Sequence, residues 1–344
     1  MNSLKLRVKN MSDTNLLLTI TVVVFFLMYV LAVIFLGGGF TKPQTFFNIL
    51  NENASLLILS CGMSLVMITG GIDISVGTMT ALVCMSCAVY LDTEVGKGGN
   101  VVTAICIALA IGLAYGIVQG FLVAYLNIQP FIVSLAGMFF AKGMTTIIKA
   151  DQFNVKNEEF QALKATRIYI PFLGAVNKKG IFVPAYIEIG VVIALVLVVV
   201  LFVVLRWTKL GRAFYAVGGN LQSASMLGIN VKLTKFLAHL MCSVLASIGG
   251  WVYFMHVGSG SPSHAAGAEM NAIASSIIGG TMLTGGVGNI IGTFFGVLSL
   301  STIKNIVSQL GFDEAWWTNI TVAIMICIFL LIQSIVMRRK TKSK

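Results

Sequence analysis

Charged residues are scarce in this sequence. Only 10% of its 344 residues are Asp, Glu, Lys or Arg, while 57% are hydrophobic. An ordinary soluble domain carries about 25% charged residues, so this composition excludes one. Apolar runs recur along the whole length, each close to the roughly 20 residues with which a helix crosses about 30 Å of hydrocarbon. The sequence therefore predicts a single all-α, polytopic membrane domain over residues 1–344.

Groups for catalysis are also missing. The sequence has no Gly-x-x-x-x-Gly-Lys-Ser/Thr loop for nucleotide phosphates. Its three histidines, His239, His256 and His264, lack metal-ligand spacing, and no serine, histidine and acid set is recognisable. All six cysteines lie in apolar runs, which is typical of free thiols packed as small hydrophobes. The sequence thus predicts a protein that is not an enzyme and holds no metal or cofactor.

Acidic residues are outnumbered, 12 against 23 Lys and Arg, for a formal net charge of +11. The basic residues do not gather on one face, which argues against a nucleic-acid partner. They cluster at both ends of the chain and in segment 206–235, the positive-inside pattern of cytoplasmic segments. We therefore expect both termini in the cytoplasm and an even number of crossings. The clusters are Lys5, Arg7 and Lys9; Arg206, Lys209, Arg212, Lys232 and Lys235; and Arg338, Arg339, Lys340, Lys342 and Lys344.

About ten apolar runs are long enough to be membrane spans. No cleavage site of small residues follows the first run, so we expect it to remain as a span rather than to be removed as a signal peptide. Ten crossings place segment 206–235 inside and segment 150–185 outside, and the mixed charges of the latter suit an outer loop. The predicted spans are 15–36, 49–70, 74–91, 101–126, 131–149, 186–205, 236–256, 270–284, 289–307 and 316–337.

Two glycine-rich runs interrupt the apolar pattern, GGIDISVG at Gly70–Gly77 and GGTMLTGGVG at Gly279–Gly288. Glycine frees the backbone, and irregular backbone survives at membrane depth only where protein or a water-filled cavity surrounds it. Such interruptions are typical of helices that line a transport path. The two runs do not fall at equivalent spans of a five-plus-five repeat, so no inverted symmetry is predicted.

Asp73 is the most informative acid, because a carboxylate between apolar segments is costly unless it is capped, paired or hydrated. In one interpretation Asp73 or Ser75 caps the helix that begins at Val76. In the other, Asp73 belongs to a gate or a path. Gln119, inside the fourth span, either packs against a helix or faces the path. Lys142 either extends to the interface or lines a wet interior.

Segment 206–235 combines glycines with apolar residues, which are not expected on a segment that faces water. A short amphipathic helix is predicted at Leu221–Leu227. Exposed apolar groups on a cytoplasmic segment mark a docking surface, although a helix lying flat on the bilayer is the alternative. The glycines are Gly211, Gly218 and Gly219, and the apolar residues are Tyr215, Met226, Leu227 and Ile229.

Four motifs in order resemble permease subunits of ABC importers of the ribose/galactoside class, from Leu50 to Trp317. They are GGIDISVG, GIVQGFLVAYLNIQPFIVSLAGM, GRAFYAVGGNLQSASMLGI and EMNAIASSIIGGTMLTGGVGNIIGT. The chain is most similar to galactofuranose-type permeases, with which it shares SLAGMFFAKG and the pair Trp316 and Trp317. It departs from the family pattern at Gln119 (commonly Asn), Ile74 (Leu) and Asn271 (usually Asp).

The resemblance implies import of a monosaccharide (a pentose, a hexose or a galactofuranose-like sugar) across the cytoplasmic membrane of a bacterium. Its partners would be ABC ATPase subunits, a second copy or related permease, an extracytoplasmic sugar-binding protein and membrane lipid. A secondary sugar transporter without an ATPase is the alternative, but it should carry more embedded ionisable groups. Predicted path or gate residues are Asp73, Ser75, Gln119 and Asn271. Predicted ATPase-coupling residues are Gly211, Arg212, Tyr215, Gly218, Gly219, Asn220 and Leu227.

Overall fold

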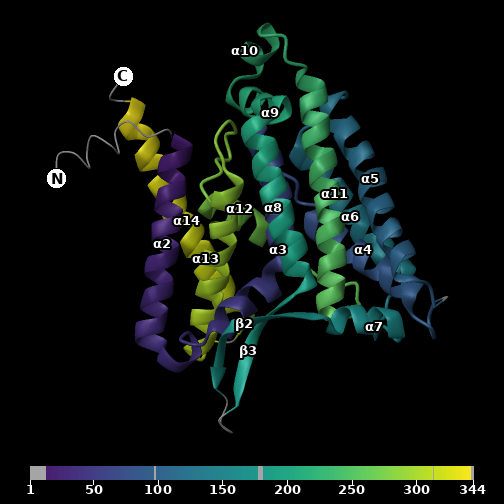
Figure 1. Cartoon of the computed structure of the whole chain (residues 1–344). Coiled ribbons are helices and arrows are strands. Elements are labelled where there is room, and N and C mark those ends of the chain that lie inside the picture. The colour runs from purple at the N-terminus through teal and green to yellow at the C-terminus, as the bar shows by residue number, and fades with distance from the viewer. Residues whose placement is uncertain (1–12, 97, 177–180, 313, 342–344) are drawn as a thin grey trace.

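The computed structural model describes residues 13–96, 98–176, 181–312 and 314–341. Within these ranges, long helices run side by side between two ends of the molecule (Figure 1). Some of the basic residues on which the topology prediction rests lie outside the described residues. They are Lys5, Arg7, Lys9, Lys178, Lys179, Lys342 and Lys344.

Each predicted span corresponds to a helix, and the all-α polytopic fold is confirmed. Among the described residues, eight helices are long and apolar enough to cross a membrane, while α4 and α12 are shorter. The six cysteines are free thiols, as predicted, but Cys106 and Cys327 are exposed rather than packed in the interior. The ten helices are α2 (Asp13–Leu36), α3 (Pro43–Ile68), α4 (Val76–Leu91), α5 (Val101–Ala124), α6 (Pro130–Ile148), α8 (Ile189–Trp207), α11 (Val231–Val257), α12 (Ala268–Ile278), α13 (Ile290–Gln309) and α14 (Ala315–Thr341).

The two short helices adjoin the glycine-rich runs. Helix α4 has 16 residues and α12 has 11, which at a rise of about 1.5 Å per residue gives lengths of about 24 and 16 Å. Non-helical segments 69–75, before α4, and 279–289, after α12, supply the remaining length. Gly70, Gly280, Gly285 and Gly286 have positive φ, the region that favours glycine. The glycine runs therefore produce the interruptions that the sequence predicted.

Helix α3 forms the centre of the molecule. In its most apolar 18-residue stretch, 83% of the residues are buried, against 22% in the corresponding stretches of α2, α6 and α14. It contacts α8, α11, α12 and α13. The outer helices therefore present most of their apolar side chains to lipid or to another protein.

Helices α5 and α11 cross at very short range, because α5 carries glycines at a spacing of four. A Cβ built on Gly112 would lie 2.3 Å from the Ser247 hydroxyl, and one on Gly120 would lie 3.0 Å from the Phe236 carbonyl oxygen. Gly116, between them, faces Leu240 in the same way. Small residues at such intervals let backbones approach closely in a membrane, and this contact fixes α11 beside the second half of α5.

Shorter elements lie at opposite ends of the molecule (Figure 1). At one end, α9 lies near the level of the start of α2 and the end of α14, and α10 lies beyond them. The opposite end carries α7 and the antiparallel hairpin of β2 and β3, while β1 pairs with β4. The described parts of segments 206–235 and 150–185 thus lie at opposite ends of the molecule. The bounds are η1 (Gly37–Gly39), β1 (Phe153–Asn154), α7 (Glu158–Ala165), β2 (Arg167–Val176), β3 (Phe182–Glu188), α9 (Lys209–Gly219), α10 (Leu221–Met226) and β4 (Ser259–Gly260).

The hairpin was not expected, since the sequence was interpreted as a loop over 150–185. Strand β2 reads RIYIPFLGAV, rich in the β-branched and aromatic residues typical of strands, so a local signal existed. Pairing runs from Arg167 with Glu188 to Ile170 with Ala185, then resumes at Gly174 with Pro184 after a shift in register.

Candidate functional site

The two glycine-rich breaks meet at helix α9. The Gly286 amide, in the second break, donates to the Ile68 carbonyl at the end of α3, at 2.9 Å. The Tyr215 hydroxyl on α9 donates to the Gly288 carbonyl at 2.9 Å. Gly218 on α9 packs directly against Ile68 and Gly286. In Figure 1 the loop between α12 and α13 rises to α9. Three motifs that are far apart in the sequence therefore share one contact.

The other predicted coupling residues shape two short helices in segment 206–235. Thr208 caps α9 by accepting a hydrogen bond from Gly211, at 3.2 Å, and the Asn220 side chain caps α10 by accepting from Ser223, at 2.9 Å. The Arg212 guanidinium donates to a nearby backbone carbonyl. The predicted amphipathic helix is present as α10. Its apolar end is open to solvent, with Met226 87% and Leu227 79% exposed.

Tyr215 differs from this exposed end, because it is half-buried against its own chain. Burial raises the pKa of Tyr215 to about 12, although Arg206 acts in the opposite direction. The hydroxyl therefore stays protonated at physiological pH and remains a donor to Gly288. The sequence offered Tyr215 as a docking group, whereas the structure uses it for an internal contact.

Asp73 is fully buried in the first break. One carboxylate oxygen accepts from the Ser75 amide at 3.0 Å and from the Ser75 hydroxyl at 2.5 Å. Ser75 is the N-cap of α4, but its side chain makes no capping bond. Asp73 thus closes a turn immediately before the helix, of the kind that aspartate favours. It does not cap the free amides of the first helical turn, and the capping interpretation of Ser75 is wrong.

Several buried polar atoms that interact with this turn or with its residues lack a hydrogen-bond partner. Among the described residues, Asp73 Oδ2, Tyr115 Oη, Gln119 Nε2 and His239 Nε2 are buried without a hydrogen-bond partner. Tyr115 and His239 are both close enough to interact electrostatically with Asp73. The His239 Nδ1 lies 2.9 Å from the Lys235 carbonyl, which can only accept, so Nδ1 carries a proton. This polar cluster joins the α4 entry, α5 and α11 inside the membrane domain.

Gln119 contacts this cluster through Ser75. Its Oε1 lies 3.4 Å from the Ser75 hydroxyl, but that hydroxyl already gives its single proton to Asp73. The contact is satisfied only if the amide is turned so that its nitrogen donates to Ser75. The structure therefore brings together three of the four predicted path residues.

The fourth predicted path residue, Asn271, lies in a separate contact. Its side-chain oxygen accepts from the Lys304 ammonium at 2.9 Å, which joins α12 to α13. Lys304 was missed in the sequence analysis. Its signal was available, since it is the only charged residue in the span predicted at 289–307, and an intramembrane lysine is a functional candidate.

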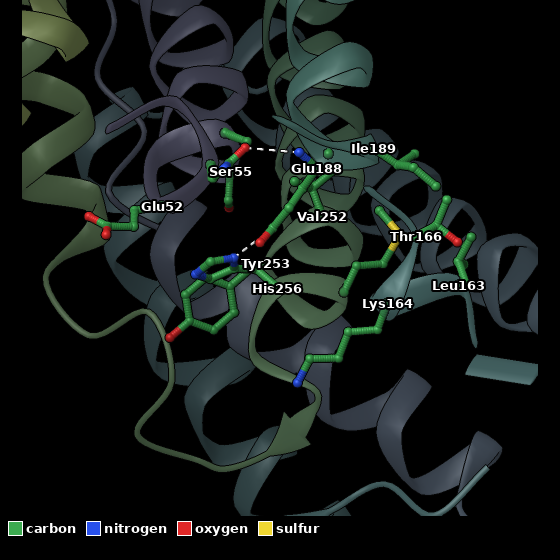
Figure 2. A pocket seen from close by; sticks show the side chains of 14 residues that line it. Glu52, Ser55, Leu163, Lys164, Thr166, Glu188, Ile189, Val252, Tyr253 and His256 are labelled. Atoms are coloured by element: carbon green, nitrogen blue, oxygen red, sulfur yellow. Dashed lines mark hydrogen bonds and ion pairs between the residues drawn. The ribbon is translucent and has the colours of Figure 1, made fainter. Parts of the chain in front are cut away.

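A second set of polar residues lies where strand β3 joins α8, beside the end of α11, and Figure 2 shows their side chains. The His256 Nδ1 and a Glu188 carboxylate oxygen are 2.8 Å apart, and the Lys164 ammonium donates to the Val257 carbonyl at 2.8 Å. An adjoining cavity of about 300 Å³ includes Arg167 and Gln161 in its wall. His256 was set aside from the sequence because the histidines lack metal-ligand spacing, and its partner Glu188 is 68 residues away along the chain. The pair fastens the end of α11 to the start of α8.

Comparisons with known proteins agree with the sequence motifs. The family described as "Branched-chain amino acid transport system / permease component" matches residues 45–329. The inner membrane ABC transporter permease protein YjfF of Escherichia coli (strain K12) is 33% identical over 94% of this chain and 93% of its own. The fructose import permease protein FruG of Bifidobacterium longum (strain NCC 2705) is 33% identical over the same shares. No solved structure matches the chain.

A ribose import permease protein, RbsC of Escherichia coli (strain K12), is 32% identical over 87% of this chain and 88% of its own. The resemblance drawn from the four motifs is thereby confirmed, and the chain is a transport subunit rather than an enzyme. It is a multi-pass protein by its helices and an ABC permease by its relatives. The chain therefore belongs to the family of permease components described for the branched-chain amino acid transport system.

Proposed function

We propose that this chain is the permease subunit of an ATP-driven importer that carries a monosaccharide into a bacterial cell across the cytoplasmic membrane. The observation that carries the proposal is the similarity, over at least 87% of the chain, to permeases named for fructose and ribose import. The family description refers to branched-chain amino acids. The choice of sugar over amino acid therefore rests on these relatives.

Uptake measurements test this assignment. A strain deleted for the gene and complemented with it should regain ATP-dependent uptake of a labelled sugar from a panel of ribose, fructose, galactose and galactofuranose. Leucine and valine in the same panel test the amino-acid alternative. Uptake that persists without the ATPase, and stops when the ion gradient is dissipated, would identify a secondary transporter instead.

The ATPase subunits would dock on α10 and the exposed side of α9. Leu221, Met226 and Leu227 are exposed apolar residues beyond the ends of the long helices, and a few such anchors usually dominate a small interface. Tyr215 is left out of this surface because its hydroxyl is already bonded within the chain. The alternative, in which α10 lies on the bilayer surface, is distinguished by the α10 variants described below.

A second permease, either a copy of this chain or a related one, would close the transport path. Lys142, on the apolar helix α6, is exposed, and Asn271 and Lys304 are partly exposed. Charged side chains that face lipid are costly, so they usually face a bundle interior or a wet cavity. We therefore place the path beside α6, α12 and α13. Crosslinking between single cysteines introduced on α6 of two tagged copies tests this arrangement.

The sugar-binding protein would approach from the opposite end. The hairpin of β2 and β3 projects there (Figure 1), and its outer part exposes apolar side chains, with Phe172 92% exposed. An unpartnered apolar surface of this kind suits a protein contact. If the hairpin binds the sugar-loaded protein, Phe172→Ser should lower uptake without releasing the ATPase.

A further inference from the structure

Two adjacent glycines on α9 have different surroundings. A Cβ built on Gly218 would lie only 1.8 Å from the Ile68 carbonyl oxygen and 2.6 Å from the Gly286 amide nitrogen. A Cβ built on Gly219 would meet nothing within 4 Å. Position 218 therefore tolerates no side chain unless backbone moves, while position 219 has room for one.

The second glycine-rich break also leaves no room for side chains where it meets the first. A Cβ on Gly285 would lie 2.9 Å from the Gly218 carbonyl oxygen and 3.0 Å from the Gly70 amide nitrogen. Gly285 and Gly286 also have φ of +83° and +75°, which disfavours a side chain independently of space. Gly70, Gly218, Gly285 and Gly286 thus form one contact of bare backbone, which we call the glycine junction.

A contact of this kind transmits displacement efficiently. Side chains can absorb a small shift by changing rotamer, whereas close-packed backbone has no such freedom. The junction is also tied by two hydrogen bonds of 2.9 Å, Gly286 to Ile68 and Tyr215 to Gly288. It joins α9 to both breaks at once, and each break adjoins a helix too short to span the membrane without it.

We propose that the glycine junction carries movement of α9 to both broken helices together, so that α4 and α12 reorient in step when the ATPase moves the α9–α10 segment. The inference rests on the proposed function, in which that segment docks the ATPase. It assigns Gly218 a positioning role that is separate from docking, because its contacts point into this chain.

The test is Gly218→Ala, with Gly219→Ala on the same helix as the matched comparison, because a Cβ on Gly219 would meet nothing within 4 Å. Each variant is reconstituted in vesicles with its ATPase and binding protein, and sugar imported per ATP hydrolysed is measured. Gly218→Ala should keep the ATPase bound and hydrolysing, while sugar imported per ATP falls about tenfold, within the range by which mutations along coupled networks act. Gly219→Ala should have a much smaller effect on sugar imported per ATP than Gly218→Ala.

If the Gly218→Ala variant fails to insert into the membrane, Tyr215→Phe provides a second test of the proposal. It adds no atom to the junction and removes only the hydrogen bond to Gly288, so it should lower sugar imported per ATP with the ATPase still bound. Equal coupling in the Gly218→Ala and Gly219→Ala variants would overturn the proposal, as would an unchanged ratio in Tyr215→Phe. If the ATPase does not bind the wild-type chain at all, the proposed function fails instead, and the pull-down reports that outcome separately.

Discussion

At the scale of single residues, the buried Asp73 is costly to the protein unless its carboxylate is stabilised. A buried carboxylate needs partners, yet only one of its oxygens is hydrogen-bonded, both times to Ser75. The other oxygen has no hydrogen-bond partner, while the carboxylate interacts electrostatically with Tyr115, His239 and Cys242. The geometry therefore explains the role of one Asp73 oxygen, which stabilises the turn. The role of the other oxygen, which has no hydrogen-bond partner, can be tested by substitution.

Asp73→Ala and Asp73→Asn separate these two aspects. Alanine leaves the Ser75 amide and hydroxyl without their acceptor, and we expect a loss of about 1–3 kcal/mol. Asparagine keeps an oxygen for the same turn and should largely preserve folding. Thermal melting in detergent measures the first effect, and sugar uptake measures the second. A folded, ATPase-bound Asp73→Asn without uptake would assign the charge to transport, whereas full uptake in both variants would remove Asp73 from the transport machinery.

Asp92, just after α4, makes stability depend on pH. Burial of the Asp92 carboxyl raises its pKa, but hydrogen bonds from the backbone amides of Lys156, Val95 and Glu94 outweigh this and hold the pKa below its ordinary value. Because the folded state favours the carboxylate, the stabilisation is present above the unfolded pKa of about 4 and is lost as pH falls through the lower folded value.

Asp92→Asn should therefore be less stable than the wild type at pH 7, and the difference should shrink as the pH falls below about 4. Melting temperature against pH in detergent is the measurement. Glu94→Gln is the matched control, since Glu94 makes an exposed ion pair with Lys156, which contributes little. A constant difference between Asp92→Asn and the wild type at all pH values would contradict the assignment.

At the scale of elements, α10 is a short helix whose apolar end lies open to solvent. Leu227→Glu should release the ATPase or uncouple hydrolysis from uptake, because it places a charge where an apolar anchor is needed. The spans should still insert, since α10 lies beyond their ends. Gln222→Glu, on the exposed side of the same helix, adds the charge without removing an apolar group. Pull-down of the ATPase with uptake in both variants decides whether α10 docks the ATPase or rests on the bilayer.

At the scale of the whole molecule, the two ends should face opposite compartments. A reporter fused after Lys344, which lies outside the described residues, should report the cytoplasm. One inserted near Asn177, also outside them, should report the exterior, because the flanking strands β2 and β3 lie at the end opposite α9. The same side for both reporters would contradict ten crossings.

The helices could be predicted from sequence because each depends on its own residues. A run such as Ile189–Trp207 is apolar enough to require a membrane by itself, and the glycines of both breaks marked irregular backbone without any tertiary information. The hairpin was missed because two strands are stable only when something holds them, and here α3 and α8 contact its base. Asn271 was predicted from the sequence as a path residue, but its partner Lys304 was not.

The sequence by itself determined the membrane domain, the ten helices, the two interruptions and the family, because hydropathy, glycine content and motifs are local properties of the chain. Only the tertiary structure decided that both interruptions meet α9, that Tyr215 points inward, and that Gln119 lies with Asp73. These contacts join residues far apart in the chain, and they depend on how closely backbones approach. Close packing arises only when two segments fold against each other, so it cannot be predicted from the sequence of either segment alone.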